Sequence, residues 1–431
     1  MSSAAGKSAG DTRRRAMARR AVAVTAVLLA AVVAAGGCSS TGRRSASPAQ
    51  RAVSLPLVTS VAAGRTTWAV VPMGAAAGPN LFWELFALPA HGSKWRLATP
   101  PDVATNGAIA LSIQGSQSLV AGIHPSLMLH FSPITSTADG GRSWATGAPD
   151  PGLASVPDAL AITPDATRLM ALDRNGGADV ATIQRAPGGH GITGPARWTT
   201  LVSARALAAT AAGRGCRLTT LTAAAFASSG TPLLGGSCGR PGVAGIFALA
   251  GGRWRAAGPE LSSLPATLRQ RKVQVLRLVR TGSRLTALLQ VGSGAGASLV
   301  SAWANEASGV GSTTVASEMN GGAWSLSPPL RLAGLTMTSS SFGRSGATAV
   351  TLARPGSAGQ HGQYVSGTGS LWHELPALPP GRTLALALPA GGDVDALAAD
   401  GSILTAWQLR RGTRWVKTQT SKVPIQYGSS S

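Results

Sequence analysis

The stretch Thr137-Ala138-Asp139-Gly140-Gly141-Arg142-Ser143-Trp144 joins a glycine-rich turn to a tryptophan, and shorter forms of this combination recur along the chain. Six further tryptophans follow a turn of small or polar residues and precede a short apolar run: Trp95, Trp198, Trp254, Trp324, Trp372 and Trp415. The seven are 49, 54, 56, 70, 48 and 43 residues apart. In a hairpin turn glycine supplies positive φ and aspartate binds the turn backbone, while a following tryptophan can cover a neighbouring sheet. The spacing indicates a repeated unit of about 40–55 residues.

Between the tryptophans the chain consists of short apolar runs separated by Gly, Pro, Asn and Asp. With 431 residues, 44% of them hydrophobic, it has ample material for a large core. Runs of this length and spacing are typical of strands in an all-β protein rather than of helices. We expect strands at residues 67–71, 81–88, 108–113, 168–172, 273–278, 284–291 and 383–388.

A unit of several strands, repeated in this way, is typical of one blade of a β-propeller. Seven units fill the chain, so we predict an all-β fold, a β-propeller of seven four-stranded blades over residues 52–427, followed by a disordered tail at 428–431. We expect the ring to close by pairing of residues 53–61 with residues 415–426.

The 137–144 stretch matches, at every fixed position, the Asp-box pattern Ser/Thr-x-Asp-x-Gly-x-Ser/Thr-Trp, and in this it resembles the sialidase-like (BNR-repeat) β-propellers. The matching residues are Thr137, Asp139, Gly141, Ser143 and Trp144. The other six turns match the pattern only in part. The resemblance implies that this hairpin is structural and lies on the outer side of a blade. Asp139 is then a turn residue and not a catalytic acid.

The resemblance does not extend to the sialidase catalytic residues, which include an arginine triad and a Tyr–Glu nucleophile pair. The chain has two tyrosines, Tyr364 and Tyr427; Tyr427 immediately precedes the expected tail and Tyr364 has no glutamate close in sequence. The family's N-terminal Arg-Ile-Pro signature is also missing. We therefore predict no sialidase activity.

Other catalytic and metal-binding patterns have little support in the sequence. Glycosidases need two carboxylates that flank the bond, and most acids here stand in turn-like contexts. Asp393 and Asp395 form a short acidic pair, which we interpret as a loop and strand-start feature rather than a ligand pair. His124 and His130 would point to one face of a single strand, so either a ligand pair or two surface histidines is possible. We predict no catalytic residue, no metal site and no cofactor.

Cys216 and Cys238 lie 22 residues apart within the fourth unit. Two neighbouring strands would bring them together, and an exported protein meets oxidising conditions. We predict a disulfide, with two buried thiols as the alternative.

The N-terminus has the layout of an export signal. Residues 1–20 carry one Lys, five Arg and one Asp, and an apolar stretch at 21–35 follows. Ala35-Gly36-Gly37-Cys38 resembles a bacterial lipobox, although Ala35 stands where leucine is preferred. We predict a signal peptide over 1–37, lipidation of Cys38 and a flexible tether over 38–51. Translation from Met17 would give a shorter leader, and the choice between the Sec and Tat routes stays open.

The chain remains strongly basic without its signal peptide. Residues 1–37 hold six of the 38 basic and one of the 16 acidic residues, which leaves +17 on the rest. Such a charge favours anionic lipids or acidic wall polymers, although an arginine-rich composition is also typical of a high-GC genome. No arginine cluster is interleaved with aromatic residues, so we predict no nucleic-acid binding.

Together these features predict an exported, non-catalytic propeller, lipid-anchored to the outer face of the cytoplasmic membrane. We expect a monomer that binds an envelope protein or a cell-wall polymer with one axial face. The long segment 292–320 is the candidate binding loop, with Trp303 as an exposed contact or, alternatively, a residue packed between blades. The competing interpretations are a propeller hydrolase or lyase acting on wall glycans or a small molecule, and an assembly factor for a membrane complex.

Overall fold

The computed structural model describes most of the chain beyond its N-terminal region. The described residues are 58–74, 81–89, 92–115, 117–126, 129–150, 152–185, 192–305, 324–344, 346–355, 360–366, 371–377, 383–389 and 393–424, all within one compact unit that spans 53–431. The predicted signal peptide, Cys38, the tether and the tail at 428–431 lie outside them, as do residues 306–320 of the candidate binding loop.

The described strands form seven successive antiparallel meanders of four. Meander 1 contains β1 (Val58–Ala63), β2 (Thr66–Gly74), β3 (Leu81–Pro89) and β4 (Arg96–Leu97), and meander 2 contains β5 (Ala108–Ile113), β6 (Leu119–His124), β7 (Ser132–Thr137) and β8 (Ala145–Asp150). Meander 3 contains β9 (Leu160–Ile162), β10 (Arg168–Leu172), β11 (Gly177–Arg185) and β12 (Ile192–Ser203). Meander 4 contains β13 (Leu218–Phe226), β14 (Pro232–Cys238), β15 (Gly245–Ala250) and β16 (Arg253–Ala256).

Meanders 5 to 7 follow the same order. Meander 5 contains β17 (Val273–Thr281), β18 (Arg284–Val291), β19 (Ser298–Asn305) and β20 (Trp324–Leu326). Meander 6 contains β22 (Thr336–Phe342), β23 (Thr348–Ala353), β24 (Gln360–Ser366) and β25 (Trp372–Glu374). Meander 7 contains β26 (Thr383–Ala387), β27 (Val394–Asp400), β28 (Ile403–Arg410) and β29 (Arg414–Lys422). A short extra strand, β21 (Leu330–Arg331), also pairs with β19.

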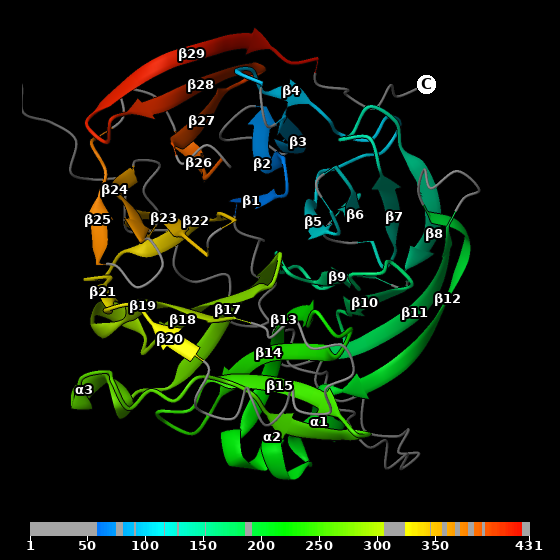
Figure 1. The fold of residues 1–431 in the computed structure, drawn as a ribbon, viewed down its shortest axis with the longest axis vertical. Helices are drawn as coiled ribbons and strands as arrows, with labels where there is room; N and C mark the ends of the chain where they lie inside the picture. Colours follow the sequence, from blue (N-terminus) through cyan, green and yellow to red (C-terminus); the bar gives the residue numbers. More distant parts are fainter. Residues whose placement is uncertain are drawn as a thin grey trace, which may run out of the picture. The chain divides into compact units, whose positions relative to one another are not determined.

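The meanders follow one another around a common centre, with the first strand of each on the inner side (Figure 1). This arrangement confirms the predicted all-β propeller fold. Six of the seven strands that the sequence predicts lie within an observed strand, and the seventh, 383–388, extends one residue beyond β26; residues 108–113, 168–172 and 284–291 coincide with β5, β10 and β18. Alternating apolar residues and turns at these positions explain the agreement.

The inner strands of meanders 1 and 6 pair directly with each other. β1 and β22 run parallel, with Thr59 opposite Ser340. Ser60 faces the other way, where its Oγ donates a hydrogen bond of 2.9 Å to the Leu386 carbonyl of β26. The inner strand of meander 7 therefore lies behind the β1–β22 pair. Because hydrogen bonding joins some meanders into larger sheets, the number of blades stays a prediction.

The ring closes differently from our expectation. β29 pairs with β28 and β1 pairs with β2 and β22, so the described parts of the two segments, 58–61 and 415–424, do not pair with each other as predicted. Side chains join meanders 1 and 7 instead. The backbone N–H of Trp95 donates to Gln419 Oε1 at 2.7 Å, and Gln419 Nε2 donates back to the Trp95 carbonyl at 2.8 Å. A backbone hydrogen bond of 3.0 Å from the Gly74 N–H to the Gly401 carbonyl also joins these two meanders.

The seven tryptophans of the repeat lie in, or just before, the outermost strand of their meanders. Four of their indole N–H groups donate to the preceding meander of the ring. The acceptors are the Ala257 carbonyl for Trp324, the Pro328 carbonyl for Trp372, the Pro376 carbonyl for Trp415 and the Asp395 carboxylate for Trp95. A large apolar side chain with one polar atom thus links neighbouring sheets.

Trp303 is a buried residue of β19 and not an exposed contact. Its side chain is 8% exposed, and the strand pairs it with Thr286 on one side and Ser325 on the other. Trp303 is therefore a packed strand residue, the alternative that the sequence left open, and the exposed position expected of a contact residue is not observed.

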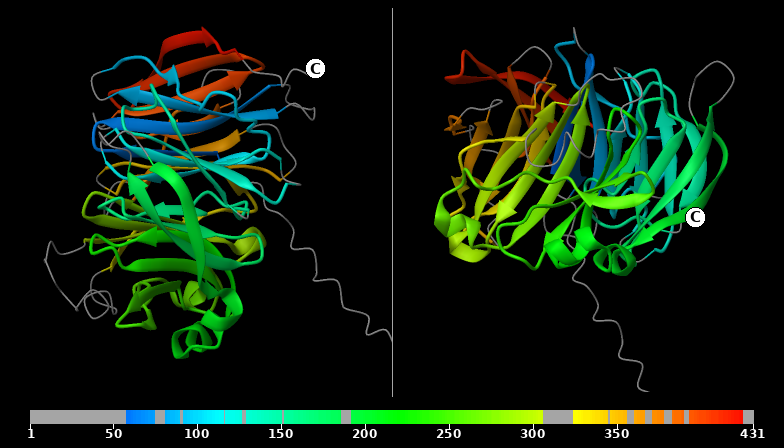
Figure 2. Two further views of the ribbon diagram at one scale, coloured as in Figure 1. Left: turned by 90° about the vertical axis from the view of Figure 1, so that its right-hand side faces the viewer. Right: turned by 60° about the horizontal axis from the view of Figure 1, so that its bottom comes forward.

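Short helices interrupt the strands in a few places. They are α1 (Ala204–Ala208), α2 (Ala211–Cys216), α3 (Ala266–Arg269) and the 3-10 turn η1 (Gly294–Gly296). Ser203 and Thr210 cap the first two, each accepting from a backbone N–H of the first turn. Figure 2 shows α1 and α2 at the outer edge of the meanders. No helix in the described ranges has the length and apolar character that crossing a membrane requires.

The structure contains the Cys216–Cys238 disulfide that the sequence predicts. It connects the end of α2 to the end of β14, and a Cβ added at Gly245 would lie 2.8 Å from the sulfur of Cys238. The bond therefore attaches the helical insertion to meander 4 and packs directly on β15.

Candidate functional site

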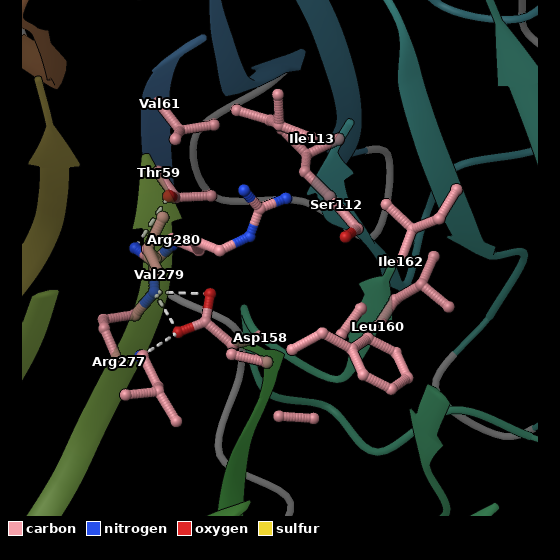
Figure 3. Close-up of a pocket in the computed structure, with 16 residues that line it drawn as sticks. Thr59, Val61, Ser112, Ile113, Asp158, Leu160, Ile162, Arg277, Val279 and Arg280 are labelled. Atoms are coloured by element: carbon pink, nitrogen blue, oxygen red, sulfur yellow. Dashed lines mark hydrogen bonds and ion pairs between the residues drawn. The ribbon is translucent and has the colours of Figure 1, made fainter. Parts of the chain in front are cut away.

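A small cavity of about 40 Å³ lies among the inner strands (Figure 3). Its lining comes from β1, β5, β9, β13 and β17, strands far apart in the sequence, and most of the side chains are aliphatic. The polar and charged members include Thr59, Ser112, Asp158, Arg277 and Arg280. These residues are the centre of the candidate site.

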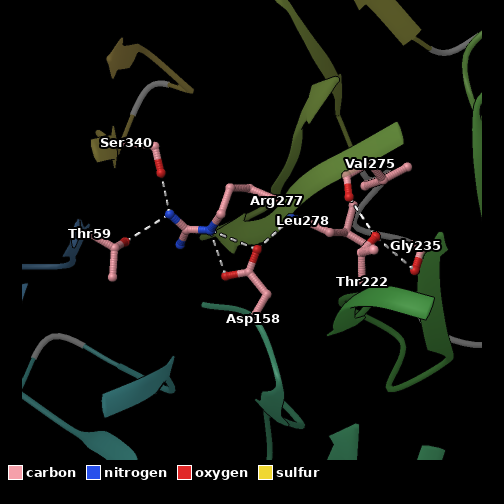
Figure 4. A network of polar contacts seen from close by, with 8 residues as sticks. All are labelled: Thr59, Asp158, Thr222, Gly235, Val275, Arg277, Leu278 and Ser340. Carbon is pink, nitrogen blue, oxygen red and sulfur yellow. Dashed lines mark hydrogen bonds and ion pairs between the residues drawn. The ribbon is translucent and has the colours of Figure 1, made fainter. Parts of the chain in front are cut away.

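Asp158 and Arg277 form a buried ion pair at this centre (Figure 4). Arg277 Nε lies 2.9 Å from both carboxylate oxygens of Asp158, and the side chains are 3% and 5% exposed. Asp158 also accepts from the backbone N–H of Leu278 at 2.7 Å. A carboxylate buried in this way is stable only when such donors replace water.

The other end of the Arg277 guanidinium holds the β1–β22 pair. Its Nη1 donates to Thr59 Oγ1 at 2.8 Å and to Ser340 Oγ at 2.5 Å, two residues that face each other in the parallel register. The guanidinium also lies 5.0 Å from the centre of the Phe342 ring. One arginine therefore ties together β17, β1, β22 and the segment before β9.

A β-bulge explains how Arg277 reaches the centre. The register of β17 against β18 shifts between Val275 and Arg277, so Leu276 has no partner in the ladder. A bulge adds one residue and re-aims the next side chain. The sequence VQVLRLVR at residues 273–280 gives no direct sign of this shift, and Arg277 is not among the residues predicted from the sequence.

This arrangement limits the chemistry of the cavity. Among its described lining residues Asp158 is the only carboxylate, and it is already bound by a guanidinium and a backbone N–H. Hydrolysis of a glycoside by the usual mechanisms needs two carboxylates with different protonation states. The ion pair instead locks four chain segments together.

A larger pocket of about 360 Å³ opens where the inner strands begin, which we call the upstream end. It lies between Val156 and Pro157 on one side and the starts of β17 and β22 on the other. Within the described part of the chain its lining carries no charged residue, and the polar residues include Gln274 and Gln290, which face each other across the β17–β18 ladder. Such a lining suits an uncharged ligand surface.

The histidine pair considered from the sequence does not form. His124 ends β6 and is 1% exposed, while His130 is exposed beyond the strand, so the two do not share one face. Neither ring nitrogen of His124 has a hydrogen-bond partner among the described residues. Burial, followed by the charge of Arg174, lowers the pKa of His124 to about 4. The described ranges hold no cluster of three potential metal ligands.

The two acidic positions near residue 394 have separate places. Asp393 precedes β27, and Asp395 lies inside it, where the indole N–H of Trp95 donates to its carboxylate at 3.0 Å. Burial raises the pKa of Asp395 to about 6, with Asp393 adding to the rise. Asp395 therefore belongs to the seam between meanders 1 and 7.

Tyr364 lies opposite Glu374 in the β24–β25 pair. Burial, and then the charge of Glu374, raises the pKa of the Tyr364 hydroxyl. Both strands are on the outer side of meander 6, away from the central cavity. Tyr427 lies outside the described residues.

Asp139 is held entirely by its own turn. Its carboxylate accepts from the backbone N–H of Arg142 and Ser143 at 2.9 and 3.0 Å, and from the hydroxyls of Ser143 and Thr137 at 2.6 and 2.8 Å. Burial opposes ionisation, but these hydrogen bonds together hold the pKa of Asp139 well below its usual range. The carboxylate has no capacity left for a substrate.

The comparisons with known proteins return propellers among solved structures. No family model matches the chain, and no curated protein sequence matches it. The β-propeller domain of the trilobed protease from Pyrococcus furiosus is similar with 7% identity and a TM-score of 0.44, over 85% of this chain and 96% of that one. A protein from Lactobacillus plantarum is similar with 11% identity and a TM-score of 0.48, over 84% and 97%.

A GH74 xyloglucanase from Xanthomonas campestris is also similar, with 14% identity and a TM-score of 0.48. The match covers 82% of this chain but only 52% of the xyloglucanase, so the chain spans about half of that enzyme. These likenesses concern the fold alone.

Proposed function

We propose that this chain is an exported, lipid-anchored propeller that binds another envelope component through the upstream end of its ring, without catalysis. The observation that carries the proposal is the contrast between the two adjoining sites. The central ion pair is fully used to hold strands together, whereas the upstream pocket of about 360 Å³ is open and uncharged. Gln274 and Gln290 of its lining are half-buried and Thr336 is exposed, so these side chains can contact a partner without disturbing the core.

The anchoring part of the proposal depends on the sequence. Cys38 in the lipobox-like stretch would carry the lipid, residues 39–51 would form the tether, and the propeller would stand at the outer face of the cytoplasmic membrane. Membership of the sialidase-like, BNR-repeat group is likewise proposed. The hydrogen bonds that Asp139 accepts within the 137–144 turn support it, because they account for each fixed position of the pattern except the glycine and the tryptophan.

A pull-down from envelope extracts tests this proposal. The bait is the chain from Ser39 onward, used at low and at high salt, together with Leu335→Asp, which places a charge in the upstream pocket. Leu371→Asp is the matched control, because Leu371 is 62% exposed and is not part of that pocket.

We expect a defined envelope component to be retained at high salt by the wild type and by Leu371→Asp, and lost with Leu335→Asp. Capture that disappears with salt for all three baits would point to the basic surface alone. That result would overturn the proposal that the upstream end binds an envelope component. It would favour the hydrolase alternative, and hydrolysis of wall glycans should then be assayed.

A further inference from the structure

A second pocket opens at the other end of the inner strands, which we call the downstream end. It has a volume of about 340 Å³. Its lining comes from the ends of β1, β5 and β17 and from Arg344 beyond β22. The upstream pocket contains Gln274 at the start of the nine-residue strand β17, and the downstream pocket contains Arg280 and Thr281 at its end. The two pockets are therefore separate sites.

The downstream pocket differs from the upstream one in charge. Arg280 and Arg344 both line it, and none of the described residues that line it is acidic. Arg280 also lines the central cavity, into which its guanidinium extends in Figure 3. Its Nη1 donates to the Gly282 carbonyl at 2.9 Å, which orients the side chain over the end of the strand. Two positive charges at one opening attract anions.

Thr281 supplies an independent sign of a ligand. Its side chain is 6% exposed, it lines this pocket, and its Oγ1 has no hydrogen-bond partner among the described residues. A buried hydroxyl without a partner costs free energy, so such groups usually bind water or a ligand. Here Thr281 lines the same pocket as Arg280 and Arg344, with room for another molecule.

We propose that the downstream pocket binds the phosphate group of an anionic ligand. A phosphodiester presents two charged oxygens and two ester oxygens arranged tetrahedrally, so it can accept from two guanidinium groups and a hydroxyl that approach from different directions, whereas the two oxygens of a carboxylate lie in one plane. The turns that complete the pocket are open: a Cβ added at Gly282, where φ is +66°, would meet no atom within 4 Å. A phosphate borne on a longer polymer or on a lipid headgroup can therefore approach from solvent.

This site goes beyond the proposed binding role of the upstream end, because it lies at the opposite end of the ring and needs no protein partner. Calorimetry with the purified full chain tests it. The probe is a glycerol phosphate oligomer, compared with a glutamate oligomer of equal charge. Dihexanoyl-phosphatidylglycerol, as dissolved monomers, distinguishes a lipid headgroup from a free polymer as the source of the phosphate.

We expect the glycerol phosphate oligomer to bind and the glutamate oligomer to bind at least tenfold more weakly. Arg280→Gln and Arg344→Gln should each weaken phosphate binding by at least tenfold. The matched control is Arg253→Gln, which removes the same charge from an exposed position of the outer strand β16 and should change affinity less than twofold.

Thr281→Val separates a ligand contact from a structural role. The substitution keeps the shape and removes a hydroxyl that makes no hydrogen bond to any described residue, so the unfolding midpoint should stay unchanged. Phosphate binding should weaken by threefold to tenfold. Equal weakening by Arg253→Gln, equal binding of the glutamate oligomer, or an unaltered affinity of Thr281→Val would each overturn the proposal.

Discussion

Arg277 Nε lies 2.9 Å from both carboxylate oxygens of Asp158, although 119 residues separate the two in the sequence. The pair joins β17 to the segment before β9, and the same guanidinium holds Thr59 and Ser340 of the β1–β22 pair. Because this parallel pairing sets the arrangement of meanders 1, 6 and 7, a single buried arginine organises the centre of the fold.

Replacing Arg277 by methionine should destabilise the protein strongly. The change leaves the Asp158 carboxylate buried without its main partner and frees two hydroxyls, and loss of one member of a buried pair typically costs about 3–5 kcal/mol. Chemical denaturation measures the free energy of unfolding. Arg253→Met on the exposed strand β16 is the control and should stay within about 0.5 kcal/mol of the wild type. A similar loss in both variants would argue against a structural role for the pair.

Gly141→Ala should destabilise the 137–144 turn by roughly 1–3 kcal/mol. Gly141 has φ of +81°, and a Cβ there would lie 2.9 Å from Ala98 Cβ and 3.2 Å from the Trp68 ring of the neighbouring meander. Gly251→Ala is the control, because its φ of +57° brings similar strain but no atom lies within 4 Å. If thermal unfolding shows that the two variants lose the same stability, close packing of the turn against meander 1 does not contribute to the free energy of unfolding.

Removal of the disulfide should cost about 3 kcal/mol, the loop-closure value for a crosslink that spans 22 residues. The Cys216→Ala, Cys238→Ala double variant tests this by denaturant unfolding without reductant. Adding reductant should lower the stability of the wild type to that of the double variant and leave the double variant unchanged. A wild type that is insensitive to reductant under unfolding conditions would contradict the expectation.

The sequence predicted the local features of the fold well. Strands such as β5 and β18 and the turn around Asp139 depend on neighbours a few residues away, and alternation, glycine and the Asp-box pattern report such neighbours directly. The Cys216–Cys238 bond followed from the proximity of adjacent strands.

What the sequence could not predict depends on distant contacts. The pairing of β1 with β22 replaces the expected closure between the chain ends, and it depends on a guanidinium donated from β17. Arg277 reaches the centre through a one-residue bulge, which leaves no composition signal. Trp303 is an aromatic residue beside a long segment, and only the β18–β19 register shows that it belongs to a sheet. Local sequence patterns do not reveal such contacts between distant residues.

His124 should make the protein less stable as the pH falls. Its pKa is lowered to about 4 in the folded state, against an ordinary value of 6.5, so the unfolded chain takes up the proton first. Stability contributed by the neutral ring is present above pH 6.5 and is lost between about pH 6.5 and 4, by roughly 3 kcal/mol. His124→Leu should be less sensitive to pH over this range, with His130→Leu at an exposed site as the control. Identical pH profiles for the wild type and His124→Leu would rule this out.

Asp395 should act in the opposite direction at the seam between meanders 1 and 7. Burial raises its pKa to about 6 from an ordinary 3.8, so the folded state holds the proton that the unfolded chain releases. The sign follows directly: an acid with a raised folded pKa destabilises the fold as the pH rises from about 4 to 6, here by roughly 2–3 kcal/mol. Asp395→Asn keeps an oxygen that can accept from the Trp95 indole and removes the titration.

The two effects overlap between about pH 4 and 6, so they partly cancel in the wild type. Asp395→Asn should therefore reveal the His124 slope, with stability that falls more steeply towards low pH than in the wild type. Near pH 7 the same variant should be more stable than the wild type, because no buried carboxylate remains ionised beside Trp95. Denaturant unfolding from pH 4 to 7 measures both, with Asp400→Asn at an exposed strand end as the control. A wild-type slope that Asp395→Asn leaves unaltered would mean that the seam carboxylate does not titrate in this range.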